Sequence, residues 1–240
     1  MTVKIRLFVD HSLGEAQLVT LDRDQANYLF AVMRLSIGDA ILVFNGKDGE
    51  WQAHITEGNK KSATLKCTLK TQPLQNPPDV WLLFAPIKKA RTDFIVEKAT
   101  ELGAAEILPI STDFTNSERI RQDRLQAHAV EATEQCGGTY VPNVHDLQKL
   151  DNVLDAWPGD RHLLYCDEGL VGAASTFNSL PTGKWAILIG PEGGFSERER
   201  SKITMMQQSH PVSLGPRILR ADTAAVAALS LWQEHLGDWR

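Results

Sequence analysis

The sequence predicts an α/β protein whose mostly parallel sheet is preceded by a small β-rich domain. Before residue 72, short runs of β-branched and aromatic residues follow one another with one helical interruption. From residue 80 onward, strand-like and helical runs alternate, which is typical of a parallel sheet with crossover helices. Segment 73–79 is rich in proline, which continues neither a helix interior nor a central strand, so this segment is expected to be a linker. We therefore expect two domains, 1–72 and 80–240.

The first domain is expected to contain five short strands and one helix. The helix covers about 23–33 and ends beside Arg34. Segment 45–49 reads Asn-Gly-Lys-Asp-Gly and predicts a hairpin turn, because asparagine and glycine tolerate the positive φ angles of such turns. The strands are expected at 3–9, 17–21, 40–45, 50–56 and 63–69.

The second domain is expected to alternate five strands with five helices. In parallel sheets of this kind, ligands bind beyond the carboxyl ends of the strands. The strands are expected at 80–85, 106–110, 162–166, 185–189 and 212–214. The helices are expected at 91–102, 119–135, 146–156, 197–208 and 222–235.

Two glycine-bearing segments each join an expected strand to an expected helix. Residues 189–196 read Ile-Gly-Pro-Glu-Gly-Gly-Phe-Ser, and Ser196 with Glu199 forms the Ser-x-x-Glu pattern that begins a helix. In the second segment, 213–225, Asp222 or Thr223 is expected to cap the last helix. Both segments are expected to meet at the carboxyl edge and form one small-molecule site. Their spacing matches neither a nucleotide P-loop nor a Rossmann turn, and the alternative is that each is an ordinary turn.

Together the two segments resemble a signature of the SPOUT class of RNA methyltransferases, and within it the ribosomal RNA uridine-N3 methyltransferase family. That signature has Gly-Pro-Glu-Gly-Gly followed by Leu-Gly-x-Arg-Ile-Leu-Arg-x-Glu/Asp-Thr-Ala, which residues 190–194 and 214–224 match closely. Weaker matches extend the resemblance over nearly the whole chain, at 6–9, 32–35, 97–103 and 131–135. Gly138 and Asn27 depart from the family pattern, in which arginine and histidine are common at these positions.

The resemblance implies a fold, a cofactor and a substrate. It implies that the last segments of the second domain form a deep trefoil knot, and that the first domain is a PUA-like β-barrel that binds RNA. It also implies a homodimer built around the knot. The methyl donor would be S-adenosylmethionine, and the acceptor would be N3 of a specific uridine in the 16S ribosomal RNA of the small ribosomal subunit.

The two loops and the resemblance together indicate the site residues. Arg220 is the leading catalytic candidate, because a positive charge stabilises the uracil anion left when N3 loses its proton. The alternative for Arg220 is a salt bridge to Glu192 or Asp222 that fixes the loop. Glu192 is expected to accept backbone N–H groups and hold its turn, and Glu168 either accepts a hydrogen bond from the cofactor or is a surface residue. The expected cofactor-binding residues are Glu168, Ile189, Gly190, Pro191, Glu192, Gly194, Ser213, Leu214, Gly215, Ile218, Leu219 and Thr223.

The net charge of -5 does not favour broad nucleic-acid binding, because phosphate contacts need lysine and arginine. The first 72 residues are close to neutral, so RNA contact is expected from a local basic patch. Arg6 and Arg34 have apolar neighbours in the sequence, and burying an arginine among such residues is unfavourable unless it binds a partner. For each candidate the alternative is a solvated surface charge. The expected RNA-contact residues are Arg6, Arg34, Lys88, Lys89 and Arg91.

Composition sets further limits on function. No run is apolar enough to span a bilayer and no signal peptide precedes the first domain, so we expect a cytoplasmic protein. Three cysteines lie far apart and are expected to be buried apolar residues, and neither they nor the histidines show metal-ligand spacing, so no metal is expected. Two other functions remain open: a non-catalytic RNA-binding or ribosome-assembly factor, and a sister SPOUT enzyme that methylates a ribose hydroxyl of transfer RNA.

Overall fold

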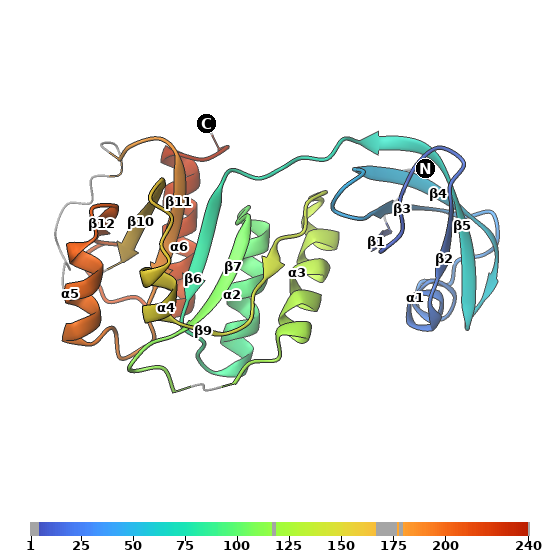
Figure 1. Cartoon of the computed structure of the whole chain (residues 1–240). Helices are drawn as coiled ribbons and strands as arrows, with labels where there is room; N and C mark the ends of the chain where they lie inside the picture. Colours follow the sequence, from blue (N-terminus) through green and yellow to red (C-terminus); the bar gives the residue numbers. More distant parts are fainter. Residues whose placement is uncertain (1–4, 117–118, 167–176, 178–179, 240) are drawn as a thin grey trace. The chain divides into compact units, whose positions relative to one another are not determined.

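The chain divides into two compact units, each with its own core (Figure 1). The first unit comprises the residues up to Asn76 together with Thr133–Val141, and the second comprises Pro77–Ala132 and the chain from Pro142 onward. The division after Asn76 falls within the expected linker 73–79. The sequence did not predict that 133–141 belongs to the first unit. This computed structural model describes residues 5–116, 119–166, 177 and 180–239.

The first unit contains a five-stranded sheet in the order β1-β3-β4-β5-β2. The first pair is parallel and the other neighbours are antiparallel. The strands lie close to the expected positions, although β4 and β5 are longer than expected. They are β1 (Arg6–Phe8), β2 (Leu18–Leu21), β3 (Ala40–Phe44), β4 (Glu50–Asn59) and β5 (Ser62–Gln72).

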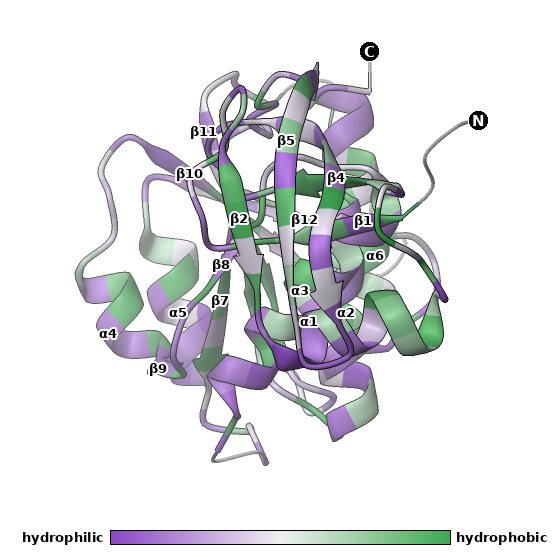
Figure 2. Ribbon diagram, turned by 90° about the vertical axis from the view of Figure 1, so that its right-hand side faces the viewer, coloured by the Kyte–Doolittle hydropathy of each residue, from purple (hydrophilic) through white to green (hydrophobic). Residues whose placement is uncertain are grey.

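One face of this sheet covers the core of the first unit. Along β5, Ala63, Leu65 and Cys67 are buried, whereas Lys66 and Thr68 between and after them are exposed. This period of two places alternate side chains on opposite faces. Figure 2 shows the alternation as apolar and polar bands along β4 and β5.

The expected helix of the first unit is present but changes its winding. It begins as α1 (Arg23–Asn27), where Asp22 and Gln25 form a capping box, and continues as one π-helical turn, η1 (Tyr28–Val32). The wider turn ends at Val32, and Arg34, two residues later, has a φ angle of 57° in the left-handed region. That conformation is uncommon for a residue with a Cβ atom. It presents Arg34 at the surface.

The second unit contains an entirely parallel sheet in the order β12-β10-β11-β6-β7-β8, with β9 paired to β7. The strands are β6 (Val80–Phe84), β7 (Glu106–Ser111), β8 (Asn143–Val144), β9 (Gln148–Lys149), β10 (Arg161–Cys166), β11 (Lys184–Ile189) and β12 (Ser209–Val212). The helices are α2 (Lys89–Glu101), α3 (Gln122–Cys136), α4 (Leu150–Asp155), α5 (Glu197–Met205) and α6 (Ala221–His235), and the end of α3 from Thr133 onward belongs to the first unit.

Both faces of the parallel sheet are covered by helices. Leu163 and Leu188 pack with Leu150 of α4 and Ile203 of α5 in one apolar cluster. The strand residues between them point to the opposite face, where α6 lies against β11 and packs on α2. Burial on both faces explains why these strands are nearly continuous apolar runs. None of the described helices is long and apolar enough to cross a membrane.

Two local predictions for the second unit are wrong. The last strand is Ser209–Val212, earlier than the expected 212–214. It is an edge strand whose neighbour in the described sheet is β10. Pro211 has no backbone N–H to donate, and an edge strand tolerates this because one of its sides has no neighbouring strand to bond to. The cap of α6 is Arg220, without a side-chain hydrogen bond, instead of Asp222 or Thr223. Asp222 lies in the first turn, where its charge favours the helix N-terminus.

Candidate functional site

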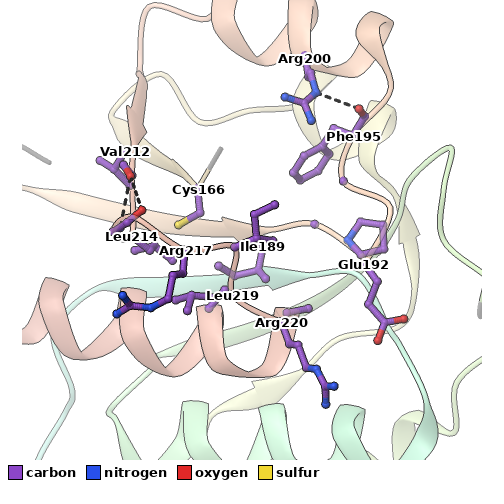
Figure 3. A pocket seen from close by; sticks show the side chains of 18 residues that line it. Cys166, Ile189, Glu192, Phe195, Arg200, Val212, Leu214, Arg217, Leu219 and Arg220 are labelled. Carbon is purple, nitrogen blue, oxygen red and sulfur yellow. Dashed lines mark hydrogen bonds between the residues drawn. The ribbon is translucent and has the colours of Figure 1, made fainter. Parts of the chain in front are cut away.

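A cavity of about 200 Å³ lies at the carboxyl edge of the parallel sheet. Its floor is formed where three adjacent strands end, at Cys166 of β10, Ile189 of β11 and Val212 of β12. The loops after β11 and β12, which carry the two glycine segments, form its walls. Figure 3 shows these loops around the cavity, together with the beginning of α6. The expected convergence of the two segments is therefore present.

The loop after β11 is held in place by its own helix cap. Ser196 caps α5, and the buried Glu199 carboxylate accepts hydrogen bonds from the backbone N–H groups of Ser196 (2.9 Å) and Asp113 (2.8 Å). The Ser196 hydroxyl donates to Asp113 (2.5 Å). This hydrogen bond, followed by the Arg198 guanidinium, holds the pKa of the Asp113 carboxyl below its usual range. The loop after β11 is therefore held at the end where it joins α5.

Glycine is required at two positions of this loop. A Cβ atom on Gly190 would lie 2.7 Å from Cε2 of Phe195, a buried ring that meets Tyr165 edge-on. Gly194 has a φ angle of 69°, which a β-branched residue adopts only with strain. The loop backbone therefore passes close to the cavity without side chains in the way.

The loop after β12 supplies most of the apolar wall. Leu214 and Leu219 line the cavity, as does Ile218, whose side chain is 73% exposed. Gly215 has a φ angle of 116°, and its N–H donates to the Ser213 hydroxyl (3.3 Å). This short turn directs the aliphatic side chains to the cavity, where they suit a flat aromatic ligand.

Most of the expected cofactor-binding residues line this one cavity. Thr223 does not line it and is exposed on α6. Glu168 lies outside the described residues. The expected residues in the wall are Ile189, Gly190, Pro191, Glu192, Gly194, Ser213, Leu214, Gly215, Ile218 and Leu219, with the catalytic candidate Arg220.

Arg220 and Glu192 do not pair with each other. Arg91 of α2 takes both acidic partners, with its Nη1 3.1 Å from the Glu192 carboxylate and its Nε 3.6 Å from that of Asp222. Arg91, expected to contact RNA, thus links the two loops of the cavity. Glu192 faces this cation, and no backbone N–H to its carboxylate is found among the described residues, contrary to the expectation.

The guanidinium of Arg220 is available for another role. Among the described residues, Arg220 forms no salt bridge with Glu192 or with Asp222, the two partners that were the alternative to a catalytic role. Its side chain is exposed and points away from Cys166 and Ile189 in Figure 3. An exposed cation at the mouth of an apolar cavity can meet negative charge on an incoming substrate.

Several residues in the cavity wall were not expected from the sequence. Cys166, Phe195, Arg200, Arg217 and Ala224 also line the wall. Arg200 donates from its Nε to the Phe195 carbonyl (3.0 Å), and this contact is drawn in Figure 3. Arg200 lies one turn after the Ser196 cap, so the helix period placed it on the loop side and could have identified it. No cluster of metal-ligating side chains occurs among the described residues.

Cys166 is expected to be chemically inert despite lining the cavity. Burial raises the pKa of its thiol to about 12, and burial also raises the pKa of Cys67. Cys136 is exposed and Cys166 is half-buried, which contradicts the expectation that all three cysteines are buried. Iodoacetamide at pH 8 should therefore label Cys136 first, since the thiolate is the reactive form. Peptide mass mapping checks this result, with Cys136→Ser as the control. Rapid labelling of Cys166 in the folded protein would contradict it.

Arg6 is engaged within the first unit, and its contacts favour a structural role over the expected RNA contact. Its Nε donates to the buried Glu50 carboxylate (2.6 Å). The remaining guanidinium nitrogens donate to the backbone carbonyls of Thr133 (2.6 Å), Glu134 (2.9 Å) and Gly138 (2.6 Å). Gly138, one of the departures from the family pattern, thus contributes through its backbone.

Arg6→Ala should destabilise the first unit by about 3 kcal/mol, because it leaves the Glu50 charge buried and unpaired. Chemical denaturation followed by tryptophan fluorescence measures the change. Arg23→Ala, an exposed residue of the same unit, is the control and should change the free energy of unfolding by less than about 0.5 kcal/mol. Equal stability of the two variants would return Arg6 to the candidate RNA contacts.

Three other expected RNA-contact residues, Arg34, Lys88 and Lys89, are exposed. Arg34 lies in the first unit after the π-turn. Lys88 is the N-cap of α2, and Lys89 is its first residue and lines a second cavity. Asn27, the other departure from the family pattern, ends α1. These positions stay predictions for RNA contact.

Comparison with known proteins adds independent information. An RNA methyltransferase domain matches residues 74–233, and an RNA methyltransferase PUA domain matches residues 21–67. The chain is 28% identical to the ribosomal RNA small subunit methyltransferase E of Rickettsia conorii, over 94% of this chain and 93% of that protein. It is 32% identical to the protein of the same name from Synechocystis, over 88% of this chain and 71% of that protein.

Solved structures are similar over nearly the whole length. The structure of ribosomal RNA small subunit methyltransferase E from Neisseria gonorrhoeae bound to S-adenosylmethionine has a TM-score of 0.89 at 27% identity. It covers 98% of this chain and 99% of that one. A methyltransferase from Legionella pneumophila in complex with the same cofactor has a TM-score of 0.88 at 28% identity, covering 99% and 100%.

Proposed function

Because this chain belongs to the RNA methyltransferase family whose domain spans residues 74–233, we propose that it transfers a methyl group from S-adenosylmethionine to N3 of a uridine in small-subunit ribosomal RNA. The observation that carries the proposal is the single cavity that both signature loops form at the carboxyl edge of the sheet. The relatives named small subunit methyltransferase E support the substrate class, and the uridine N3 target follows from the signature resemblance.

The cavity has the chemistry that S-adenosylmethionine needs. Its apolar wall of Ile189, Leu214 and Leu219 suits the adenine ring, and the glycine backbone leaves room for close approach. Arg200 and Arg217 offer positive charge to the cofactor's carboxylate. Two solved relatives bound to S-adenosylmethionine support this assignment. When bound, the cofactor supplies an electrophilic methyl group.

The protein's own contribution to the reaction is positioning and electrostatics. Neutral uracil carries a proton on N3, so its nucleophilicity rises when that proton leaves. The Arg220 guanidinium stabilises the resulting anion at the mouth of the cavity. Arg91 holds Glu192 and Asp222, so the two loops keep their positions during the reaction. The N3 atom lies on the Watson–Crick edge, so the uridine has to be unpaired or swung out.

The RNA-binding role belongs in part to the first unit. The PUA match covers 21–67, which includes the exposed Arg34, and we place this residue in contact with the RNA backbone. From the same substrate we infer a cytoplasmic protein, since ribosomal subunits are assembled in the cytoplasm of bacteria such as those of its relatives.

A homodimer with a trefoil knot is part of the same proposal. The partly exposed residues Val226, Ala227 and Ser230 give α6 a surface of small side chains to which a second copy can pack closely. Ala228 is fully buried within the chain, so a charge there would disturb the fold itself. Ala227→Glu is therefore the appropriate variant. Sedimentation should show a wild-type dimer and a variant monomer, and a wild-type monomer at micromolar concentration would contradict this part of the proposal.

Calorimetry with S-adenosylmethionine separates an enzyme from a non-catalytic ribosome-assembly factor. The purified wild-type protein should bind the cofactor with one site per chain. Absence of binding would remove the main support for methyl transfer and leave RNA binding as the function.

A further inference from the structure

An exposed aromatic residue lies beside the glycine loop at the carboxyl edge of the parallel sheet. Phe114 follows β7 in the second unit, and its side chain is 48% exposed. A Cβ atom on Gly193 would lie 3.4 Å from the Cβ atom of Phe114 and 3.8 Å from its Cγ atom. Gly193 stands between Glu192 and Gly194, which both line the cavity at this edge. Phe114 therefore packs against the same turn that forms this part of the cavity wall.

The segment that carries this ring is held by hydrogen bonds on both sides of it. The Asp113 N–H donates to the Glu199 carboxylate (2.8 Å), and the Asp113 carboxylate accepts from the Ser196 hydroxyl (2.5 Å). Thr112 and Thr115 close a turn around the ring, since the Thr112 N–H donates to the Thr115 hydroxyl (2.8 Å) and the Thr115 N–H to the Thr112 carbonyl (3.1 Å). A partner that contacts the ring therefore has little backbone freedom to remove.

The carboxylates next to the ring are paired with cations. Asp113, the preceding residue, lies 3.0 Å from the Arg198 guanidinium. Glu192, the residue before Gly193, lies 3.1 Å from the Arg91 guanidinium. A nucleic-acid strand that approaches the ring therefore meets carboxylates whose charge is already compensated.

An unpaired base is the partner that such a ring suits. Proteins recognise single-stranded RNA largely by stacking unpaired bases on aromatic side chains. A uridine that is methylated on its Watson–Crick edge leaves its pair, and the base next to it loses a stacking partner. The ring of Phe114 stands beside the wall of the cavity that is to receive the uridine, so it can replace that partner.

We propose that Phe114 is a stacking platform for the unpaired base next to the target uridine of the substrate RNA. This inference rests on the proposed function, since the strand is the one that carries that uridine. The contact holds the strand in its unpaired form while the uridine occupies the cavity mouth. It tolerates any base, because every base has a π face, and so it positions the RNA without reading its sequence.

The test measures RNA binding without the cofactor. Filter binding of small-subunit ribosomal RNA over a salt titration compares the wild type with Phe114→Ala. Loss of one stacked base should weaken binding by about 5- to 150-fold. The slope of log K against log salt should stay unchanged, because no phosphate contact is lost. Phe114→Tyr keeps the aromatic face and should bind RNA as the wild type does.

Phe114→Leu separates stacking from packing. Leucine keeps an apolar side chain against Gly193 but has no flat face for a base. We expect this variant to lose RNA affinity much as Phe114→Ala does, while calorimetry shows wild-type affinity for S-adenosylmethionine. Wild-type RNA affinity in Phe114→Leu, or an equal loss of cofactor affinity, would show that the ring supports the loop and would overturn the stacking contact.

Trp239→Ala is the matched control. Trp239 is also an exposed aromatic residue (50%), and it follows α6, whose 15 residues extend about 22 Å from the cavity mouth at Arg220. This variant should keep wild-type RNA affinity. Unchanged affinity or a lowered salt slope in Phe114→Ala, or an equal loss in the control, would contradict the stacking contact. Methyl transfer by the wild type is measured separately, so its absence would contradict the proposed function while the RNA affinities still decide the role of Phe114.

Discussion

Replacing Gly190 by valine should weaken S-adenosylmethionine binding by roughly 10- to 100-fold. The new Cβ atom would lie 2.7 Å from the Phe195 ring, which is buried and cannot move away freely. Forcing extra atoms into a packed contact of this kind costs about 1–3 kcal/mol, and each 1.4 kcal/mol is about tenfold in affinity. The backbone of the loop would shift instead, and with it the wall of the cavity at the carboxyl edge of the sheet. Calorimetry with S-adenosylmethionine measures the loss.

Gly159→Val is the control for this experiment. Gly159 lies in the turn before β10, and a Cβ atom there would meet nothing within 4 Å. This variant should bind the cofactor as the wild type does. Gly194→Val should also lose affinity, through strain at a φ angle of 69°. Wild-type affinity in both Gly190→Val and Gly194→Val would show that the cofactor binds elsewhere.

Arg220→Ala should lower kcat for methyl transfer by roughly 100- to 1,000-fold while cofactor affinity stays near that of the wild type. The reason is that removal of one preorganised charge from a developing anion has an effect of this size. The defect should shrink at high pH, where uracil ionises without assistance. Single-turnover rates with labelled S-adenosylmethionine and small-subunit ribosomal RNA, measured across a pH series, test both statements.

Arg217→Ala serves as the comparison, because Arg217 is also an exposed cation in the wall of the same cavity. We expect it to weaken cofactor binding with a smaller effect on kcat. If Arg220→Ala lost cofactor affinity and kept a pH-independent defect, Arg220 would be a cofactor-binding residue. If its kcat were unchanged, Arg220 would have no catalytic role.

The sequence predicted the strands and the positions of the two glycine-bearing loops well because both depend on local signals. Strands such as β6 and β11 are short apolar runs bounded by breakers, and the Ser196–Glu199 cap was found in the structure as expected. The edge strand β12 was misplaced because Pro211 obscured its pattern. The π-turn after Asn27 was missed because its apolar spacing also suits an α-helix.

Charged residues were harder to assign because their partners are distant in the chain. Arg6 was expected to contact RNA, yet it pairs with Glu50, 44 residues away, and with carbonyls more than 120 residues away. Arg91 pairs with Glu192, 101 residues away. The neighbouring sequence indicates that an arginine such as Arg6 binds a partner but does not identify that partner.

The most direct measurement of the proposed activity is the identity of the methylated nucleoside. Small-subunit ribosomal RNA, isolated from a strain that lacks this protein and supplied alone or within the subunit, is incubated with the purified protein and S-adenosylmethionine. The RNA is then digested and its nucleosides are resolved by mass spectrometry. We expect 3-methyluridine at one position, absent from the reaction with Gly190→Val. A methyl group on a ribose hydroxyl, or no methyl transfer in either substrate form by a protein that binds the cofactor, would contradict it.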